Sequence, residues 1–213
     1  MPSSTPSSSL FDRWSATYDL PGLQRFTYRP IHDAIVAQLA EAHPSTVVDL
    51  GCGTGQLTRR LIERFPDAAV IGVDFSAGML AEATGRLGPN PADHPALVQA
   101  EAERLPFGPS SVDVVVCTES FHWYRDQAEA LDGLAEIVRP GGRVLVASIA
   151  TMTGLGDDIV RRLTSRGGRP IRALPPERLR RLLDRAGFEV VDQRRVPRLG
   201  LIGWPVLTDA RHP

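Results

Sequence analysis

Hydrophobic and polar positions change their spacing in a regular alternation between residues 46 and 149. Short runs rich in valine, isoleucine and leucine predict buried strands. The longer stretches between them, with apolar residues three and four positions apart, predict amphipathic helices. The predicted strands cover residues 46–50, 69–74, 97–101, 112–118 and 143–149, and the predicted helices 56–65, 77–87 and 126–138. Strands that alternate with helices in this way predict a parallel sheet with helices on both faces.

The residues before this region follow a different pattern. Residues 1–9 are rich in serine and proline, which predicts a disordered tail. Residues 10–45 predict a helical cap segment, with one helix over 23–42 whose apolar residues have helical spacing. We expect residues 10–213 to form a single domain, since this length is typical of one domain.

After residue 149 the pattern changes again. Residues 175–186 predict a helix closed by Gly187 as its C-terminal cap. Two further runs, over 190–196 and 201–207, are separated by a short link, so we expect an antiparallel pair of strands at one edge of the sheet. Pro205 suits an edge strand, because proline has no N–H group to donate to a central ladder.

Composition and charge narrow the class of protein. The 213 residues are 42% hydrophobic and 23% charged, as in ordinary globular proteins, and no apolar run is long enough to span a bilayer. The first residues lack the basic and apolar regions of a signal peptide, and only two cysteines are present, so we expect a cytoplasmic protein. The net charge of −1 argues against a nucleic-acid binder.

The charge is nevertheless unevenly distributed along the chain. The segment 157–198 holds 12 arginines and six acidic residues. A solvated helix face explains this segment, and so does a binding surface for an acidic substrate, an acidic partner or a second copy of the chain.

The strand predicted over 46–50 runs directly into a glycine-rich turn. Gly51, Gly53 and Gly55 follow Asp49 and precede a predicted helix, an arrangement that brings backbone N–H groups close to a ligand. Asp74 ends the next predicted strand, where a carboxylate can bind both hydroxyls of a ribose. A helix-capping role for Asp74 is the alternative.

The glycine spacing also discriminates between ligands. Gln56 stands where a dinucleotide-binding loop would place its later glycine. Asp49, two residues before the first glycine, would repel a pyrophosphate but attract an ammonium group. The pattern therefore favours a nucleoside that carries an amino acid over NAD.

Five segments, in this order, resemble the class I S-adenosylmethionine (SAM)-dependent methyltransferases, in the branch of ubiquinone/menaquinone-type and other small-molecule methyltransferases. The matching segments are 11–19, 49–55, 73–76, 101–107 and 138–143, and the resemblance covers nearly the whole chain from Leu10 onward. It implies a Rossmann-like α/β fold with a seven-stranded sheet of order 3-2-1-4-5-7-6, the last strand antiparallel, and helices on both faces.

The resemblance also implies SAM as the cofactor and S-adenosylhomocysteine (SAH) as its product. The positions that match the family's cofactor-binding residues are Asp49, Gly51, Gly53, Gly55, Asp74, Phe75, Met79, Glu101, Ala102 and Thr118. The family usually has aspartate where Glu101 stands, and the longer side chain can still accept a hydrogen bond from the adenine amino group. Phe75 and Met79 pack on the adenine or belong to the core. Thr118 lies where cofactor and acceptor meet in the family, or caps the next helix.

Methyl transfer needs a general base only when the attacking group carries a proton. His122 follows the strand predicted over 112–118, at the sheet edge where ligands of open α/β sheets bind, and is the best candidate. A structural histidine that caps the following helix is the alternative. Tyr18 is a second candidate, in a segment that folds over the cofactor in this family, or it anchors that segment. The five histidines lack metal-ligand spacing, so no metal site is predicted.

We therefore expect a methyltransferase that moves a methyl group from SAM to a small-molecule acceptor by in-line displacement. Two alternatives remain open, because a fold does not fix a function. One is a SAM-binding enzyme of cyclase or pericyclase type that transfers no methyl group. The other is a non-catalytic SAM-binding partner subunit.

Overall fold

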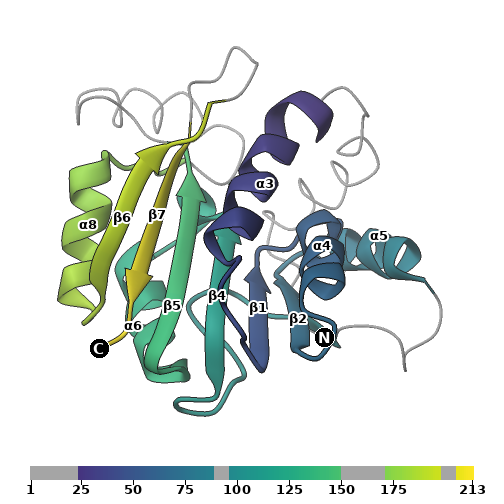
Figure 1. Ribbon diagram of the computed structural model, residues 1–213, viewed down its shortest axis with the longest axis horizontal. Helices are drawn as coiled ribbons and strands as arrows, with labels where there is room; N and C mark the ends of the chain where they lie inside the picture. Colours follow the sequence, from purple (N-terminus) through teal and green to yellow (C-terminus); the bar gives the residue numbers. More distant parts are fainter. Residues whose placement is uncertain (1–23, 89–95, 150–170, 198–204) are drawn as a thin grey trace.

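A computed structural model of the chain describes residues 24–88, 96–149, 171–197 and 205–213 (Figure 1). Within them, seven strands form one sheet in the order β3-β2-β1-β4-β5-β7-β6. This confirms the strand order that the family resemblance implies. The predicted tail over 1–9 and the candidate Tyr18 lie outside the described residues, and a single domain over 10–213 stays a prediction.

The first five strands are parallel and place their carboxyl ends at one edge of the sheet. β7 is antiparallel to both β5 and β6. The strands are β1 (Thr46–Leu50), β2 (Ala69–Asp74), β3 (Ala96–Gln99), β4 (Val112–Thr118), β5 (Val138–Ser148), β6 (Glu189–Arg195) and β7 (Val206–Arg211). Ligands of such sheets bind at the carboxyl edge of the parallel strands.

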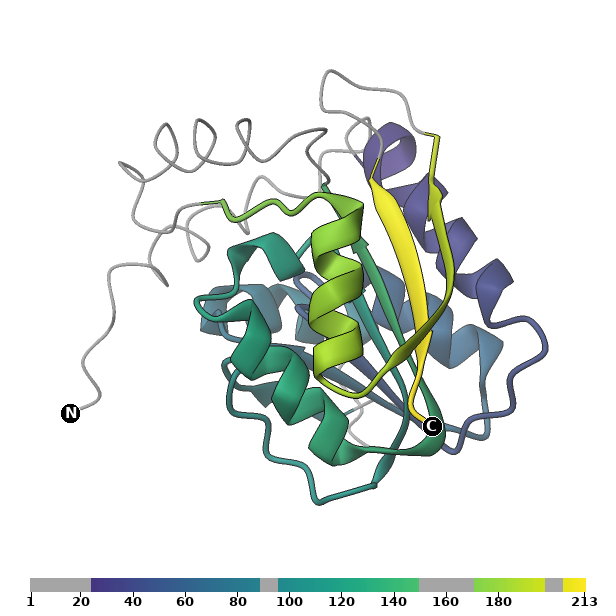
Figure 2. The ribbon, with the colours of Figure 1, turned by 90° about the vertical axis from the view of Figure 1, so that its left-hand side faces the viewer.

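Helices cover both faces of the sheet, as predicted (Figures 1 and 2). The described helices are the π-helix η1 (Gln24–Tyr28), α3 (Arg29–Gln38), α4 (Gln56–Arg64), α5 (Ala77–Leu87), the 3-10 helix η3 (Phe121–Trp123), α6 (Gln127–Ile137) and α8 (Pro176–Arg185). α3 and α4 bury their apolar sides against one face, and α6 and α8 against the other. No helix of the described ranges is long and apolar enough to cross a membrane.

Neighbouring residues of β4 divide between these two cores. Val116 packs with the α3 and α4 side chains, and Val115 packs with those of α6 and α8. This follows from the two-residue period of a strand, and because both faces are covered the strand sequence is almost entirely apolar.

The helix ends follow the capping residues in the sequence. Ser76 accepts a hydrogen bond from Met79 N at 3.1 Å and caps α5. Asp126 caps α6, and its Oδ1 accepts from the backbone N–H groups of Ala128 and Glu129, the second and third residues of that helix. Gly187, with φ +93°, follows the end of α8 in the left-handed conformation expected of a C-terminal cap.

The predicted bounds of the last strand were wrong, because β7 covers residues 206–211 rather than 201–207. β6 and β7 form the expected antiparallel pair, with β6 at the edge of the sheet and β7 between β5 and β6, so the edge position expected for Pro205 was wrong. Pro205 therefore precedes a central strand, and its carbonyl accepts from Val196 N at 2.9 Å. Because proline has no N–H group, the ladder of a strand paired on both sides begins only after it.

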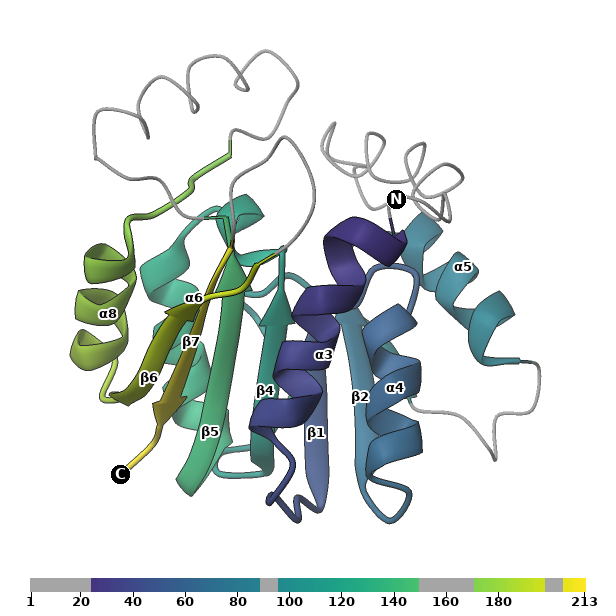
Figure 3. The same ribbon diagram turned by 45° about the horizontal axis from the view of Figure 1, so that its top comes forward.

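α3 is shorter than the predicted helix over 23–42, but it is firmly attached to the sheet. Ile31 and Ile35 are fully buried in the core beneath it. Near its end, Gln38 Nε2 donates to Asp209 Oδ2 at 2.9 Å, and Arg143 Nη2 donates to the same oxygen at 2.5 Å. These contacts fix a helix that begins near the carboxyl ends of β1 and β4 and runs along the face of the sheet in front of these strands (Figure 3).

Candidate cofactor and acceptor site

The glycine loop between β1 and α4 uses its own N–H groups to attach itself to β2. Gly51 N and Cys52 N donate to Val73 O at 2.7 and 3.0 Å. Gly53 N donates to Asp74 Oδ2 at 2.9 Å, and Gly55 N donates back to Cys52 O at 3.0 Å. The sequence led us to expect N–H groups that face the ligand, but these four stabilise the loop itself.

The three glycines of this loop are needed for different reasons. All have positive φ, of +76° at Gly51, +54° at Gly53 and +78° at Gly55, a conformation that other residues rarely adopt. A Cβ atom at Gly51 would lie 2.3 Å from Ser120 Cβ, and one at Gly55 would lie 3.1 Å from Ala83 Cβ. A Cβ atom at Gly53 would meet no atom of the described residues within 4 Å. Gly53 therefore faces open space.

That space belongs to a pocket at the carboxyl ends of β1 and β4, which we call the loop pocket. Its lining residues are Tyr28, His32, Asp49, Gly51, Cys52, Gly53, Thr54, Gln56, Leu57 and Thr118. The pocket brings together four of the predicted positions, Asp49, Gly51, Gly53 and Thr118. Sequence reasoning missed Tyr28, His32 and Gln56, since no motif marks them.

Asp49 is the most deeply buried acidic group in this pocket, at 1% exposure. Its Oδ2 accepts from the Thr58 hydroxyl at 2.6 Å. Burial raises the pKa of Asp49 from 3.8 to about 7, the Thr58 hydrogen bond opposes this rise, and the nearby Asp74 adds to it. A cation in the pocket would favour the ionised form of Asp49.

Asp74 ends β2 and holds two neighbouring turns together. Its Oδ2 accepts from Gly53 N and its Oδ1 accepts from Ser76 N, each at 2.9 Å. The two readings of Asp74, as a ligand-binding acid and as a capping acid, are therefore compatible, since each carboxylate oxygen has a second lone pair.

The other predicted cofactor residues lie after β2 and β3, outside the lining of the loop pocket. Met79 and Ala102 are buried, and Phe75 is half-buried. Glu101 is half-buried, and its Oε1 lies 3.8 Å from Arg125 Nη2. Because β1, β2 and β3 are parallel, these positions share the sheet edge with the glycine loop.

The loop after β4 is linked to the glycine loop through Ser120. Its hydroxyl donates to Leu50 O at 2.9 Å and lies 3.1 Å from Cys117 Sγ and 3.2 Å from Tyr124 Oη. Burial raises the pKa of the Cys117 thiol to about 11, so this group stays protonated at neutral pH. The cluster is a structural connection between the two loops rather than a nucleophile.

His122 lies in η3 and is 2% exposed. Its Nδ1 is 3.1 Å from Ser148 Oγ at the end of β5, and its carbonyl accepts from Arg172 N at 2.7 Å. His122 is not part of the loop-pocket lining. This candidate base therefore lies outside the loop pocket, at the ends of β4 and β5 on the same edge of the sheet.

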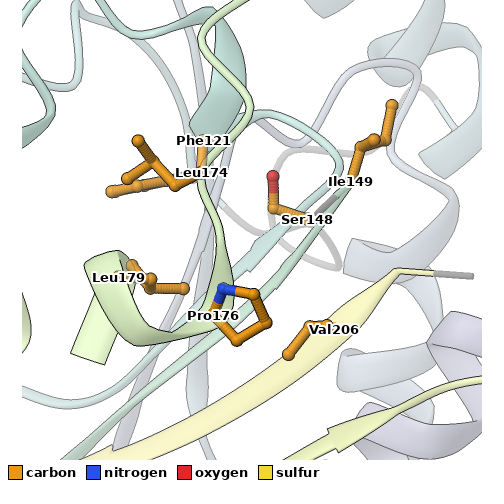
Figure 4. Close-up of a pocket in the computed structure, with 7 residues that line it drawn as sticks. All are labelled: Phe121, Ser148, Ile149, Leu174, Pro176, Leu179 and Val206. Atoms are coloured by element: carbon orange, nitrogen blue, oxygen red, sulfur yellow. The ribbon is translucent and has the colours of Figure 1, made fainter. Parts of the chain in front are cut away.

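A second pocket lies beside His122 and is largely apolar. Figure 4 shows the Ser148 hydroxyl among the side chains that line it. These residues are Phe121, Ser148, Ile149, Leu174, Pro176, Leu179 and Val206. The sheet edge thus has a polar pocket at β1 and β4 and an apolar pocket at β5 and β7.

Comparison with known proteins relates this arrangement to a family. A methyltransferase-domain family matches residues 47–142. Malonyl-[acyl-carrier protein] O-methyltransferase of Hahella chejuensis is 33% identical over 148 residues, 67% of this chain and 49% of that protein. Trans-aconitate 2-methyltransferase of Methylobacterium nodulans is 37% identical over 119 residues, 55% of this chain and 43% of that protein. This chain belongs to the class I SAM-dependent methyltransferases.

A solved structure of the same fold contains the product of the cofactor. Magnesium protoporphyrin IX methyltransferase of Synechocystis PCC 6803, with bound SAH, has a TM-score of 0.72 and 21% identity over 97% of this chain and 95% of that one. The chain spans about half the length of the two curated relatives that it matches.

The loop pocket fits the amino-acid end of SAM, the methyl donor of this family. Thr118 Oγ1 is buried and has no hydrogen-bond partner among the described residues, which leaves a polar atom for a ligand. Open space in front of Gly53 accommodates a close approach, and Asp49 suits the ammonium group. When bound, SAM supplies a methyl group that its positive sulfur makes electrophilic.

We predict that Asp49 makes cofactor binding depend on pH. The ligand-free protein holds a proton on this carboxyl below about pH 7, and the cationic ligand favours the ionised form. Affinity for SAM should therefore rise about five- to tenfold between pH 6 and pH 8. In Asp49→Asn this rise should be lost, and titration calorimetry of both proteins checks it. Parallel pH curves for the two would contradict the assignment, because the titration of the ligand itself is common to both.

A second prediction contrasts two glycines of the loop. Gly53→Ala should leave the protein folded, at a strain of about 1 kcal/mol from its positive φ, and should weaken SAH binding by an order of magnitude or more. Gly51→Ala should instead lower the melting temperature, because its Cβ would collide with Ser120. Thermal unfolding and calorimetry separate the two effects. Normal SAH affinity in Gly53→Ala would show that the ligand does not approach this face.

Proposed function

We propose that the chain transfers the methyl group of SAM to a small-molecule acceptor that carries a carboxylate, and forms a methyl ester. The carboxylate oxygen bonds to the methyl carbon as the bond from that carbon to sulfur breaks, and the electron pair of the broken bond remains on sulfur. No proton moves in this step. The observation that carries the proposal is the position of Arg172. This residue lies beside η3, at the same edge of the sheet as the loop pocket.

Arg172 is fixed there by three hydrogen bonds. Its N–H group donates to His122 O at 2.7 Å, its carbonyl accepts from Gln127 Nε2 at 2.9 Å, and its Nη1 donates to Tyr124 O at 3.1 Å. Its remaining guanidinium donors have no hydrogen-bond partner among the described residues, and a planar guanidinium binds a carboxylate through two parallel hydrogen bonds. Arg172 is thus suited to orient an acidic acceptor.

Two relatives support an acidic acceptor. By their names, one methylates a malonyl group on an acyl-carrier protein and the other methylates trans-aconitate, and both of these acceptors are carboxylic acids. The segment 157–198, which includes Arg172, holds 12 arginines and six acidic residues. An acidic carrier or a second copy of the chain at this segment, and a cytoplasmic location, stay predictions.

Within this mechanism the chain supplies position rather than covalent chemistry. Asp49 and Asp74 would hold the ammonium group and the ribose, and Glu101 the adenine amino group. Thr118 would lie at the border between cofactor and acceptor. A fixed, in-line approach of the two reacting atoms can supply several kcal/mol of the barrier reduction.

An ionised carboxylate needs no general base. We therefore assign His122 a supporting role, in which its contact with Ser148 and its carbonyl bond to Arg172 hold the acceptor wall in place. A phenol, alcohol or amine acceptor would instead require a proton acceptor.

The proposal is tested with methyl-labelled SAM and a size-fractionated extract of the source organism. We expect label in the small-molecule fraction, bound as an ester that mild alkali releases as methanol. Alkali-stable label would contradict ester formation, and label in the macromolecular fraction would redirect the search to a large acceptor. Tight SAM binding without any transfer would favour the non-methylating alternatives.

The role of Arg172 is tested on the purified acceptor. Arg172→Leu should raise the KM for the acceptor by tenfold or more, because a charge-assisted pair is lost, while SAM affinity stays unchanged. Arg178→Leu is the matched control, since Arg178 is exposed on α8. An unchanged KM in Arg172→Leu would remove this residue from the acceptor site.

A further inference from the structure

The loop pocket must accommodate a charge that the family motif does not address. The amino-acid end of SAM carries a carboxylate as well as an ammonium group. Asp49 suits the ammonium group and would repel the carboxylate, so the carboxylate needs hydrogen-bond donors elsewhere in the pocket. The N–H groups of Gly51, Cys52 and Gly53 are already used within the protein.

His32 offers such a donor from a different part of the chain. It lies in the first turn of α3, is 7% exposed, and lines the loop pocket together with Thr118. Its ring has no hydrogen bond to any described residue. The pKa of His32 is lowered from 6.5 to about 4, mainly by burial and in part by the nearby Arg60, while Asp33 opposes the shift. At neutral pH the ring is therefore uncharged, with one N–H donor and one acceptor.

The position of His32 is fixed by its neighbours on the same helix. Ile31 and Ile35 are buried in the core, and Asp33 forms an ion pair with Arg60 of α4. The helix begins at the sheet edge where β1 and β4 end (Figure 3). His32 is thus held at the pocket before any ligand arrives, and ordering it on binding costs little entropy.

The N-terminus of α4 also favours an anion in the part of the loop pocket that His32 lines. Gln56 and Leu57, the first two residues of α4, line the pocket with His32. The N-terminal end of a helix carries a partial positive charge that favours carboxylates. Two independent features, a buried histidine that has no hydrogen bond to the described part of the chain and a helix N-terminus, therefore point to the same ligand chemistry.

We propose that His32 is a cofactor-binding residue, which donates a hydrogen bond to the carboxylate at the amino-acid end of SAM, opposite Asp49. This inference rests on the proposed function, because it concerns the same cofactor. It makes α3 a part of the binding site rather than a cover for the sheet. It also means that the pocket selects nucleosides that carry the complete amino acid.

Two ligands that differ only in the amino-acid end test the proposal. SAH contains the carboxylate and the ammonium group, whereas 5′-methylthioadenosine keeps the adenosine and the sulfur but lacks both. His32→Ala should weaken SAH binding about ten- to one-hundredfold, as expected for a lost hydrogen bond to a charged group. It should change the affinity for 5′-methylthioadenosine less than twofold. His32→Gln, which keeps a donor, should recover part of the SAH affinity.

The control variant is His43→Ala, because His43 is exposed and lies outside the pocket. Calorimetry without an acceptor separates this test from methyl transfer, and thermal unfolding establishes that each variant is folded. Equal losses for both ligands, or an unchanged affinity for SAH, would overturn the proposal while leaving the proposed function intact. A wild-type protein that binds neither ligand would overturn both.

Discussion

The hydrogen bonds between the glycine loop and the end of β2 fix the geometry on which the rest of the site depends. Val73 O receives two N–H groups of the loop and Asp74 receives a third. The loop is therefore rigid without a ligand, and it leaves the strand ends open in front of Gly53. The same bonds remove the donors that a glycine-rich loop is usually expected to offer. In the binding site that we propose, the polar groups of the cofactor are therefore recognised by the side chains of Asp49 and Thr118 and by α3 as well as by the loop itself.

The ionisable groups of the loop pocket are complementary to the charges of the ligand that we propose for it. Asp49 lies close to Asp74, and burial of the first carboxyl disfavours its ionised form. His32, on α3, is kept uncharged by burial and by Arg60. A neutral wall and an acid that ionises readily in the presence of a cation match a ligand that is zwitterionic at one end and positively charged at sulfur. Buried polar groups without a partner cost free energy. Asp49 and His32 are therefore stabilised most by a ligand that carries both the ammonium group and the carboxylate.

The sequence predicts the sheet well because periodicity and glycine spacing are local signals. The runs that became β1, β2 and β4 are buried on both faces, and their boundaries agree with the structure to the residue. The bounds of β7 were mispredicted because Thr208 and Asp209 are polar, although both are buried by strand pairing on both sides and Asp209 also by its contact with Arg143. His32, Tyr28 and Gln56 could not be predicted as pocket residues, since their positions depend on how α3 packs over β1 and β4. Asp49 and Thr118 could be, because a strand end leads directly to the edge of the sheet.

A cluster of contacts around Ser120 joins the glycine loop to the loop after β4. Ser120 packs against Gly51 and bonds to Leu50 O, and its hydroxyl also lies near Tyr124 Oη. The carbonyl of Tyr124 in turn accepts from the Arg172 guanidinium. The glycine loop and Arg172, which we propose to bind the acceptor, therefore share a short chain of contacts. In-line displacement tolerates little misalignment between the attacking atom and the methyl carbon. A connection that is already formed in the ligand-free protein reduces the reorganisation that binding must drive, so in the mechanism that we propose the fold itself sets the distance between the cofactor site and the acceptor site.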